Sequence, residues 1–523
     1  MIRRGLLIGA LAALMLAGTQ AKSETLRWSS VGDVATLDPA AHNETFTNNL
    51  HLHVYDSLVR RDRNMKIEPA LATSWERIGA DRWRFKLRRG VTFHEGEPFN
   101  ADDVVASVAR MLDPGSRGAG NFPSIARAEK FDDFTVDLVL KGPYPLLLND
   151  LCWLSIMSKP WMEKHDSLKP GNIAKNVTTY ASTHANGTGP FIVESYQPDS
   201  KTVFVSNKKW WDKPTHNLTR IEFRPIKSDA TRVAALLSGE LDLVAPAPLQ
   251  DLDRISATQG FKVVQEPSFR LIFLGLNWRP ELLAMPGQKN PLLDLKVRQG
   301  LWHAIDIETI QKRIMRGKAK ATGTLVAPQI AGYDPKLSVP YGYDPEKAKK
   351  LLSDAGFAKG FKIDLNCSND RFIADEQLCV AIGSMWAKVG VEANVKTETR
   401  AAFFPRVDRG ETDAYLYGWA NLPAMDSISV ISVVLASRKD AYGGNNPNGL
   451  SNARIDEIAR AAAVELDEDK RIKLLQEALK IARDQVSIIP LHLQPVAWAM
   501  RSNLDVPQFP DEYVRLWFAN LKK

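Results

Sequence analysis

GVTFHEGEPFNADDV, residues 90–104, places His94 within nine positions of three acidic side chains, those of Glu95, Glu97 and Asp102. Histidine beside carboxylates is the composition of many metal and catalytic sites. A zinc-binding HExxH motif needs both histidines on one helical turn, yet its fifth position is Pro98 here. Glycine and proline in this spacing are typical of a turn. We therefore interpret the segment as scaffold and predict no metal ligand and no catalytic residue in it.

The residues on either side of this turn predict a strand before it and a helix after it. Upstream, apolar and basic residues alternate over 82–88, which is the pattern of a half-buried strand. Downstream, Asn100 is a good N-cap, and acidic residues in the following turn suit the positive end of a helix. The apolar stripe of that helix consists of Val104, Val105, Val108 and Leu112.

Length and composition limit the number of domains, the kinds of partner and the fold class that we expect. The chain has 523 residues, which predicts two or three domains rather than one core. Basic residues are scattered over the chain despite a net charge of +7, without blocks or interleaved aromatic residues, so we expect no nucleic-acid partner. Strands and helices alternate along the sequence, which indicates an α/β protein with partly parallel sheets.

Residues 1–21 have the pattern of a cleavable export signal. Arg3 and Arg4 precede an apolar run over 5–18, and small residues lead to a cleavage site after Ala21. The run is short for a membrane span. A lipid anchor is not expected, because no cysteine lies at the cleavage point. We expect a periplasmic protein. The choice between general secretion and twin-arginine export stays open, with general secretion favoured.

The three cysteines predict one disulfide. In an oxidising compartment two of them can pair, and Cys367 with Cys379 is the pair we favour because it closes a short loop. Cys152 lies in an apolar stretch and is interpreted as a buried thiol. His51 and His53 are two residues apart on an expected helix and would face different sides, so we expect surface or interface roles and no shared metal.

Seven stretches, in this order, resemble the extracellular solute-binding proteins of family 5, which serve ABC importers. Each stretch alone is weak evidence, but together they span nearly the whole chain after the signal. They are ALATSWERIGADRWRFKLRRGVTFHEGEPFNADDV, NGTGPFIVESY, LLSGELDLV, LLDLKVRQGLWHAID, YDPEKAKKLLSDAGF, YLYGWA and DEDKRIKLLQEALKIARDQVSIIPLH.

The resemblance implies an α/β fold of the two-lobed periplasmic binding protein class, type II and cluster C-like, that closes around its ligand. Lobe one would hold residues 22–275, with an extra subdomain near 66–180, and lobe two residues 276–488. Residues 489–523 would return to lobe one. Two crossing strands, near FLGLNW and IIPLHL, would form the hinge.

The resemblance also indicates where a ligand would bind. Peptide-binding members hold the ligand amine with an aspartate shortly after a Gly-Trp pair, but here that position is Leu422 and an acid comes only at Asp426. The arginine that dipeptide-binding members carry in the preceding helix is also missing. Arg371 could replace it as a carboxylate partner or could equally form a surface ion pair. Trp419 could stack on the ligand or pack in the core. The candidate ligand-binding residues are Trp419, Asn421, Asp426, Arg371, Asp370, His42 and Asn43.

The function implied is capture of a peptide-like or other small solute for an inner-membrane ABC permease with its ATPase subunits. We expect a monomer without cofactor or enzymatic activity. A carrier of haem or a metal chelate with the same fold is the alternative. A secreted hydrolase fits less well because no Gly-x-Ser-x-Gly or HExxH motif is present, although a catalytic triad can be assembled in space. A periplasmic chaperone would bind unfolded chains without closing a cleft.

Overall fold

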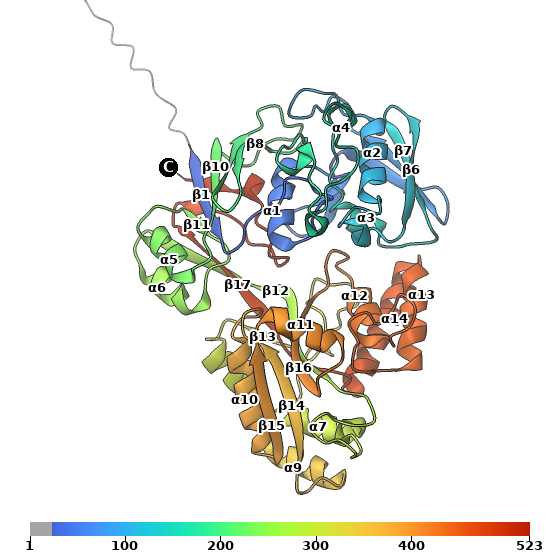
Figure 1. Ribbon diagram of the computed structural model, residues 1–523, viewed down its shortest axis with the longest axis vertical. Coiled ribbons are helices and arrows are strands. Elements are labelled where there is room, and N and C mark those ends of the chain that lie inside the picture. The colour runs from blue at the N-terminus through green and yellow to red at the C-terminus, as the bar shows by residue number, and fades with distance from the viewer. Residues whose placement is uncertain (1–23, 523) are drawn as a thin grey trace, which may run out of the picture.

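The computed structural model describes residues 24–522, which form two lobes joined by a pair of long strands (Figure 1). These strands are β12 (Phe261–Leu276) and β17 (Ile489–Arg501), which pair antiparallel. They include residues 273–276 of FLGLNW and residues 489–493 of IIPLHL, the segments that were expected to cross between the lobes. The two-lobed α/β fold is confirmed, whereas the lobe boundaries stay a prediction. The expected export signal over 1–21 lies outside the described residues.

One mixed sheet runs through both lobes. Its strand order is β15-β14-β16-β12-β17-β11-β1-β10-β9-β8, and β13 pairs with β17. The pairs β1–β10, β1–β11, β14–β15 and β14–β16 are parallel, as the alternation of strands and helices predicted. The remaining strands of this sheet are β1 (Thr25–Ser30), β8 (Phe191–Gln197), β9 (Lys201–Ser206), β10 (Arg220–Pro225), β11 (Leu243–Val244), β13 (Lys320–Ala321), β14 (Phe361–Ser368), β15 (Val391–Glu398) and β16 (Ala414–Ala420).

A second, four-stranded antiparallel sheet lies in the upper lobe of Figure 1, within the range expected for the extra subdomain. Its order is β4-β5-β7-β6, and α2 (Ala101–Met111) packs against β6 and β7. Their core includes Phe85, Phe93, Val104 and Val108. The strands are β4 (Ala72–Arg77), β5 (Arg82–Leu87), β6 (Ile125–Asp132) and β7 (Thr135–Leu140), with a small pair, β2 (Val59–Arg61) and β3 (Ile67–Pro69), nearby.

Helices cover the sheets in both lobes. The upper lobe has α1 (Thr45–Val54), α3 (Leu147–Leu151), α4 (Lys159–Lys164), α5 (Asp229–Leu237) and α6 (Leu252–Ala257). The lower lobe has α7 (Leu295–His303), α8 (Ile307–Thr309), α9 (Pro345–Asp354), α10 (Asp375–Ala387), α11 (Arg400–Asp408), α12 (Ile428–Val430), α13 (Ala453–Val464) and α14 (Glu468–Asp484). Within residues 24–522 no helix combines the length and the apolar composition that a membrane crossing requires.

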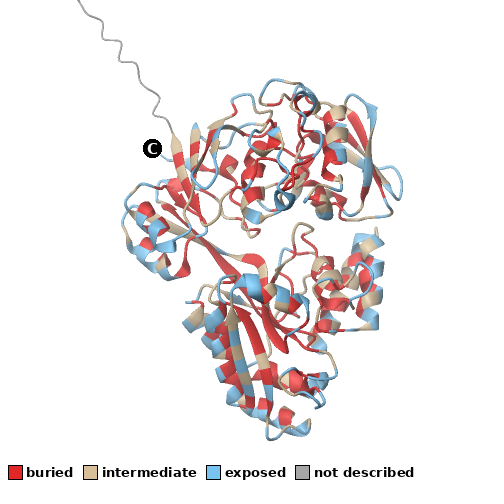
Figure 2. Ribbon diagram, viewed as in Figure 1, coloured by how far each residue is buried: buried red, intermediate tan, exposed pale blue. Residues whose placement is uncertain are grey.

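Burial follows the sheets, and the two long strands are buried to different extents along their length. Figure 2 shows the central strands buried, while the helices around them alternate between buried and exposed residues. Strand β17 is buried at every position except its last residue. The buried surface is therefore continuous from one lobe to the other.

The segment 90–104 forms the turn and helix start that its sequence predicts. The backbone N–H of Phe93 donates to the carbonyl of Glu97 at 2.8 Å and closes the turn. The side chain of Asn100 accepts from the backbone N–H of Asp102 at 2.8 Å, and the Asp103 carboxylate accepts from the Asn100 N–H at 2.8 Å. This reciprocal cap satisfies two donors that the helix itself cannot.

The acids and the histidine of the turn bind neighbouring parts of the upper lobe. His94 Nε2 lies 3.0 Å from the carbonyl oxygen of Gly189. Glu95 accepts from the indole N–H of Trp161 at 2.7 Å, and Glu97 from the side-chain amide of Asn186 at 3.0 Å. These residues join the turn to Trp161 and to the glycine-rich stretch at 186–189, and the predicted turn and helix start are confirmed.

The glycine-rich stretch packs directly on the end of α1. A Cβ atom added at Gly187 would lie 2.0 Å from the carbonyl oxygen of Val54, and one at Gly189 would lie 2.7 Å from it. Only glycine permits such a close approach of two backbones. The Gly-Thr-Gly sequence therefore serves packing between two backbone segments.

The expectation that His51 and His53 serve the surface or an interface was wrong, because both are buried. His51 Nε2 lies 2.8 Å from the carbonyl oxygen of Thr36. His53 Nδ1 lies 3.0 Å from the carbonyl of Asn49, and its Nε2 accepts from the backbone N–H of Leu516 at 3.2 Å. Burial lowers the pKa of each ring to about 4. These neutral rings fix α1 to the loop before it and to the C-terminal segment.

The cysteine predictions are confirmed. Cys367 and Cys379 form a disulfide, and Cys152 is a buried free thiol. Helix α9 is capped at both ends, with the Asp344 side chain accepting from the N–H of Lys347 at 2.9 Å and Gly356 in the left-handed conformation after the helix.

Candidate functional site

A cleft lies between the lobes. Its main cavity has a volume of about 360 Å³, and an adjoining cavity of about 220 Å³ shares Thr45, Leu422 and Tyr513 with it. The upper lobe and the C-terminal segment contribute Thr45, Asp511, Glu512 and Tyr513 to the main cavity. Strand β12 and the lower lobe contribute Arg270, Arg371, Phe372, Phe404, Tyr417, Gly418, Trp419, Ala420 and Leu422.

Aromatic side chains form the walls of this cleft. Tyr417 and Trp419 are two apart on β16 and therefore point to the same face of the strand. Tyr417 contacts the rings of Phe404 and Phe372, with centroids 5.6 and 6.3 Å away. The indole N–H of Trp419 donates to Ser429 Oγ at 3.0 Å, which fixes the ring in place. The walls can accept a flat or apolar part of a ligand.

On the opposite side of the cleft, Tyr513 is held by a second aromatic residue. Its ring lies 4.7 Å from the ring of Trp153, which follows α3 in the upper lobe. Trp153 also lines the smaller cavity together with Asn43 and Glu44. The side chain of Glu44 accepts from the N–H groups of Phe46 and Thr47 at the start of α1.

Arg371 is the charged group of the main cavity that has no acidic partner. In the part of the chain that the structure describes, no carboxylate lies within 4.0 Å of its guanidinium nitrogens, and its guanidinium carbon lies 5.0 Å from the ring centroid of Phe372. By contrast, Arg270 Nε lies 3.3 Å from Glu512, and Asp511 is paired with Arg515. Burial and the charge of Arg270 lower the pKa of the Arg371 guanidinium. An anion at this position would gain a charge-assisted hydrogen bond.

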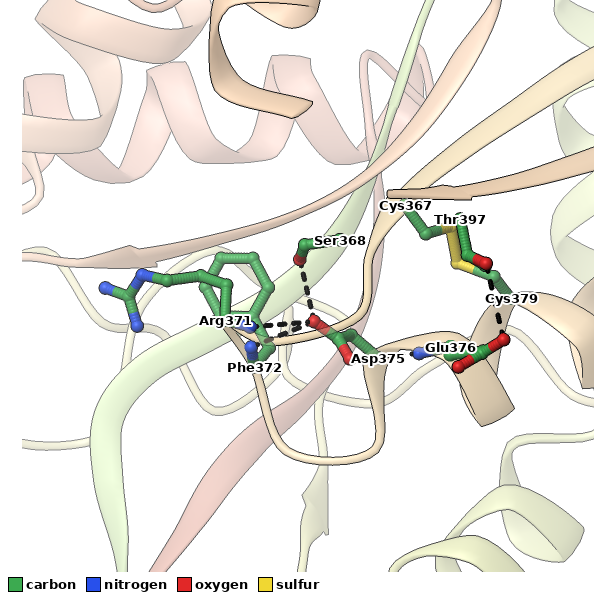
Figure 3. The surroundings of a disulfide bond; sticks show 8 residues. All are labelled: Cys367, Ser368, Arg371, Phe372, Asp375, Glu376, Cys379 and Thr397. Carbon is green, nitrogen blue, oxygen red and sulfur yellow. Dashed lines mark hydrogen bonds between the residues drawn. A yellow bond between two sulfur atoms is a disulfide. The ribbon is translucent and has the colours of Figure 1, made fainter. Parts of the chain in front are cut away.

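The loop between β14 and α10 presents Arg371 to the cleft. The buried carboxylate of Asp375 accepts from Ser368 Oγ at 2.7 Å and from the backbone N–H groups of Arg371 and Phe372, each at 3.1 Å (Figure 3). The side chain of Arg371 extends away from Asp375 in this view. The backbone of the loop is thus fixed while the guanidinium remains available.

Gly418 is needed at its position because Phe372 lies against it. A Cβ atom added there would lie 2.5 Å from a ring carbon of Phe372. The glycine of the Gly-Trp pair therefore leaves room for the ring that neighbours Arg371, while Trp419 lines the cavity.

The structure brings some of the predicted ligand-binding residues together. Arg371 and Trp419 line the main cavity, and Asn43 lines the smaller one. His42 lies beside Asn43 at a further small cavity, with Nδ1 3.3 Å from Thr47 Oγ1. Asp370 is exposed, and its carboxylate accepts from the backbone N–H of Arg400 at 2.6 Å.

Asn421 and Asp426 lie outside these cavities and are buried. The side-chain amide of Asn421 donates to the carbonyl of Leu325 at 3.3 Å. Both oxygens of Asp426 accept from the guanidinium of Arg471, at 2.5 and 2.8 Å. Contact of either residue with a ligand stays a prediction, and in this structure both hold the segment that follows β16.

Several cleft residues were missed from the sequence. Tyr417 could have been found, because it alternates with Trp419 on the same strand. Arg270, Glu512 and Tyr513 reach the cleft from β12 and the C-terminal segment, and no local pattern marks them. Between residues 24 and 522, no group of three or more histidine, cysteine or acidic residues is arranged to hold a metal ion.

Known proteins match this chain over most of its length. Residues 66–440 match the description "Bacterial extracellular solute-binding proteins, family 5 Middle". The chain is 30% identical over 468 residues to heme-binding protein A of Haemophilus influenzae, covering 84% of this chain and 81% of that protein. It is 29% identical over 519 residues to the dipeptide-binding protein of Escherichia coli, covering 93% and 91%. The structure of HbpA2 from Haemophilus parasuis superimposes with a TM-score of 0.81 at 26% identity, covering 95% of this chain and all of that one.

Proposed function

Since the chain belongs to the bacterial extracellular solute-binding proteins of family 5, we propose that it captures a peptide-like solute in the periplasm for an ABC importer. Members of this family are periplasmic binding proteins. The proposal extends to this chain the roles expected from its sequence, namely a monomer without catalytic activity that delivers its ligand to an inner-membrane permease with ATPase subunits.

The unpaired guanidinium of Arg371 is the observation that carries this proposal. A half-buried charge without a partner has lost part of its hydration, and an anionic ligand group would compensate for that loss. The planar guanidinium matches a carboxylate with two parallel hydrogen bonds. The carboxylate of a peptide-like ligand binds at Arg371, and its side chain or backbone lies against Trp419 and Tyr417.

The opposite end of the ligand meets different groups. Leu422 lines both cavities at the position where peptide-binding relatives were expected to hold an amine with an aspartate. An amine on the ligand would instead meet Glu44, which lines the smaller cavity. Asn43 and His42 contact the ligand from the rim, and Asp370 borders the arginine. Asn421 and Asp426 act indirectly by holding the segment after β16.

Binding closes the lobes on the ligand. Residues 22–275 and 489–523 form one lobe and residues 276–488 the other, with β12 and β17 between them. The ligand shifts the protein to the closed form only by binding that form more tightly. The groups that make this difference are those on facing walls, Arg371 and Trp419 on one side and Tyr513 on the other.

Native mass spectrometry of the protein taken from its own periplasm tests the proposal. A discrete extra mass, or a set of masses at peptide spacing, that leaves on denaturation is the expected result. The Arg371→Gln protein, purified in the same way, should carry less of the same mass. A bare protein that also gives no thermal shift with peptides, opines or metal chelates would contradict the importer function.

A haem or metal-chelate carrier is the second candidate, favoured by the same arginine. Haem and many chelates carry carboxylates, which would pair with Arg371. The porphyrin or chelator already coordinates the metal, so the protein would need to supply few metal ligands. Optical absorption and metal analysis of the purified protein distinguish this candidate. A hydrolase is tested by peptidase and esterase assays at high protein concentration, where turnover would contradict the proposed role.

A further inference from the structure

The segment that carries Arg371 is closed on itself by the disulfide. Cys367 lies near the end of β14 and Cys379 lies in α10, twelve residues later, and both are fully buried. Arg371 lies inside the covalent ring that this bond completes (Figure 3). The ring therefore limits the conformations that the backbone around Arg371 can adopt.

Backbone N–H groups of the loop within this ring donate hydrogen bonds to α10 and to two further elements, β15 and β17. The N–H of Asn369 donates to the carbonyl of Glu398, at the end of β15, at 3.0 Å. The N–H groups of Arg371 and Phe372 donate to Asp375 in α10. The N–H of Ile373 donates to Gln494 Oε1, in β17, at 3.2 Å. The backbone that carries the guanidinium is thus attached to a strand that runs between the lobes.

The loop also reaches the upper lobe. The side chain of Ile373 packs on a buried cluster that includes Val233 and Leu236 of α5 and Ala497 of β17. Helix α5 lies in the upper lobe in Figure 1, whereas β14 and α10, on either side of the loop, lie in the lower one. A change in the angle between the lobes therefore acts directly on the residue two positions after Arg371.

We infer that the Cys367–Cys379 disulfide and the side chain of Gln494 have a positioning role. They orient the Arg371 side chain toward the anionic group of the ligand as the lobes close. The inference rests on the proposed function of Arg371. The guanidinium is held by no acidic partner in the described chain, so its direction depends on its backbone and on the ring of Phe372. Fixing that backbone before binding reduces the entropy lost when the ligand is held, which raises affinity without adding a contact.

The first experiment measures the loop without any ligand. Hydrogen exchange is followed by mass spectrometry in the wild-type protein, in the Cys367→Ala/Cys379→Ala variant and in the Cys152→Ala variant, whose buried thiol lies outside the loop. Exchange over residues 369–373 should rise at least tenfold when the disulfide is removed and should stay unchanged in Cys152→Ala. Unchanged exchange in the variant without the disulfide would overturn the inference.

The second experiment measures binding of two probes, the dipeptide Ala-Phe and its C-terminal amide. Removing the disulfide should weaken binding of the free carboxylate about tenfold and that of the amide less than twofold. Gln494→Leu, which keeps the disulfide, should give a smaller loss with the same preference, and it serves if the alanine variant does not fold. Equal losses for both probes would show that the disulfide only stabilises the lobe.

A double-mutant cycle with Arg371→Gln separates positioning from stability. If the disulfide acts through Arg371, removing it from the Arg371→Gln protein should cause no further loss of affinity for the dipeptide. An additive loss would overturn the inference. If the wild-type protein binds neither probe, the peptide part of the proposed function fails, and the exchange experiment still decides whether the disulfide orders the loop.

Discussion

The turn at 90–104 and the loop at 369–375 have opposite appearances in sequence and opposite roles in the structure. The turn contains a histidine and several acids, yet His94, Glu95 and Glu97 each bind a neighbouring group of the upper lobe. The loop has an ordinary polar sequence, yet it presents the guanidinium of Arg371 to the cleft without an acidic partner in the described chain.

The difference shows that carboxylates whose donors are already in place, as in the turn, support the fold, whereas a guanidinium without an acidic partner beside a cavity is available to a ligand. Composition alone pointed to the turn. Only the partners of each side chain distinguish the two segments.

Asp426 gives the sharpest test of this rule, because its sequence position suggests a ligand contact and its surroundings are those of a scaffold residue. Asp426→Ala leaves Arg471 buried without its carboxylate and should reduce the free energy of unfolding by about 3–5 kcal/mol. Urea unfolding measures the change. Asp469→Ala, at an exposed position on the first turn of α14, is the control and should cost less than about 1 kcal/mol. Unchanged stability with lost ligand affinity would place Asp426 in the binding site instead.

Gly187 tests the scaffold side of the comparison. Gly187→Ala forces a methyl group against the carbonyl oxygen of Val54, and because backbone cannot yield as a side chain can, we expect a loss of about 3 kcal/mol in unfolding free energy. Gly142→Ala is the matched control, since a Cβ atom there meets nothing within 4 Å. Thermal unfolding distinguishes the two. Equal melting temperatures would mean that the glycine-rich stretch and the end of α1 are not closely packed.

The buried histidines predict how acid affects the upper lobe. The pKa of His53 is about 4 in the folded protein, below the unfolded value near 6.5, so the unfolded chain takes up the proton first. Stability is therefore lost as pH falls from about 6.5 towards 4, by about 2 kcal/mol for this residue between pH 7 and 5.

Urea unfolding of wild type and His53→Gln at pH 7 and pH 5 measures this contribution. The difference between the two pH values should be about 2 kcal/mol smaller in the variant. Burial raises the pKa of Asp150 to about 7, which gives an opposite trend, but both proteins share it and the comparison removes it. An identical pH dependence in the two proteins would show that His53 is not buried in its neutral form.

Arg371 tests the functional side of the comparison. Arg371→Gln should weaken binding of a carboxylate-bearing ligand about tenfold, or about 1.4 kcal/mol, and leave the unfolding free energy unchanged. Isothermal titration with the ligand found in the periplasm measures the first quantity. Arg400→Gln removes an exposed positive charge close to the same loop and should change affinity less than twofold. A similar loss in both variants would indicate a general electrostatic effect rather than a contact.

Substitution of Asn100 is expected to cause the smallest change in stability. Asn100→Ala removes the side-chain acceptor at the start of α2 and should cost about 1 kcal/mol of stability without changing ligand affinity. Asn100→Asp, which keeps an acceptor, should recover most of the loss. A change in affinity would contradict the assignment of the whole segment to the scaffold.

Local features could be predicted from the sequence because their causes are local. The cap at Asn100 and the short loop closed by Cys367 and Cys379 involve residues close together in the chain. Arg371 and Trp419 were identified through a family resemblance, and the structure places both in the cleft, where ligand contact remains to be tested.

Features that depend on distant residues could not be predicted. The burial of His53 depends on Leu516, and the partner of Asp426 is Arg471, 45 residues later. Glu512 reaches the cleft from a C-terminal segment that carries no recognisable pattern. In each case the deciding contact joins parts of the chain whose proximity is created by the fold.

The long strands β12 and β17 have a mechanical consequence. The ladder between these two strands of the long mixed sheet is interrupted twice, between Pro267 and Leu271 and between Ile272 and Phe273. Stretching or shearing the pair of strands would break many hydrogen bonds at once, whereas bending it at an interruption breaks few. We therefore expect closure of the lobes to follow this direction of bending, which would bring the same facing side chains together around every ligand.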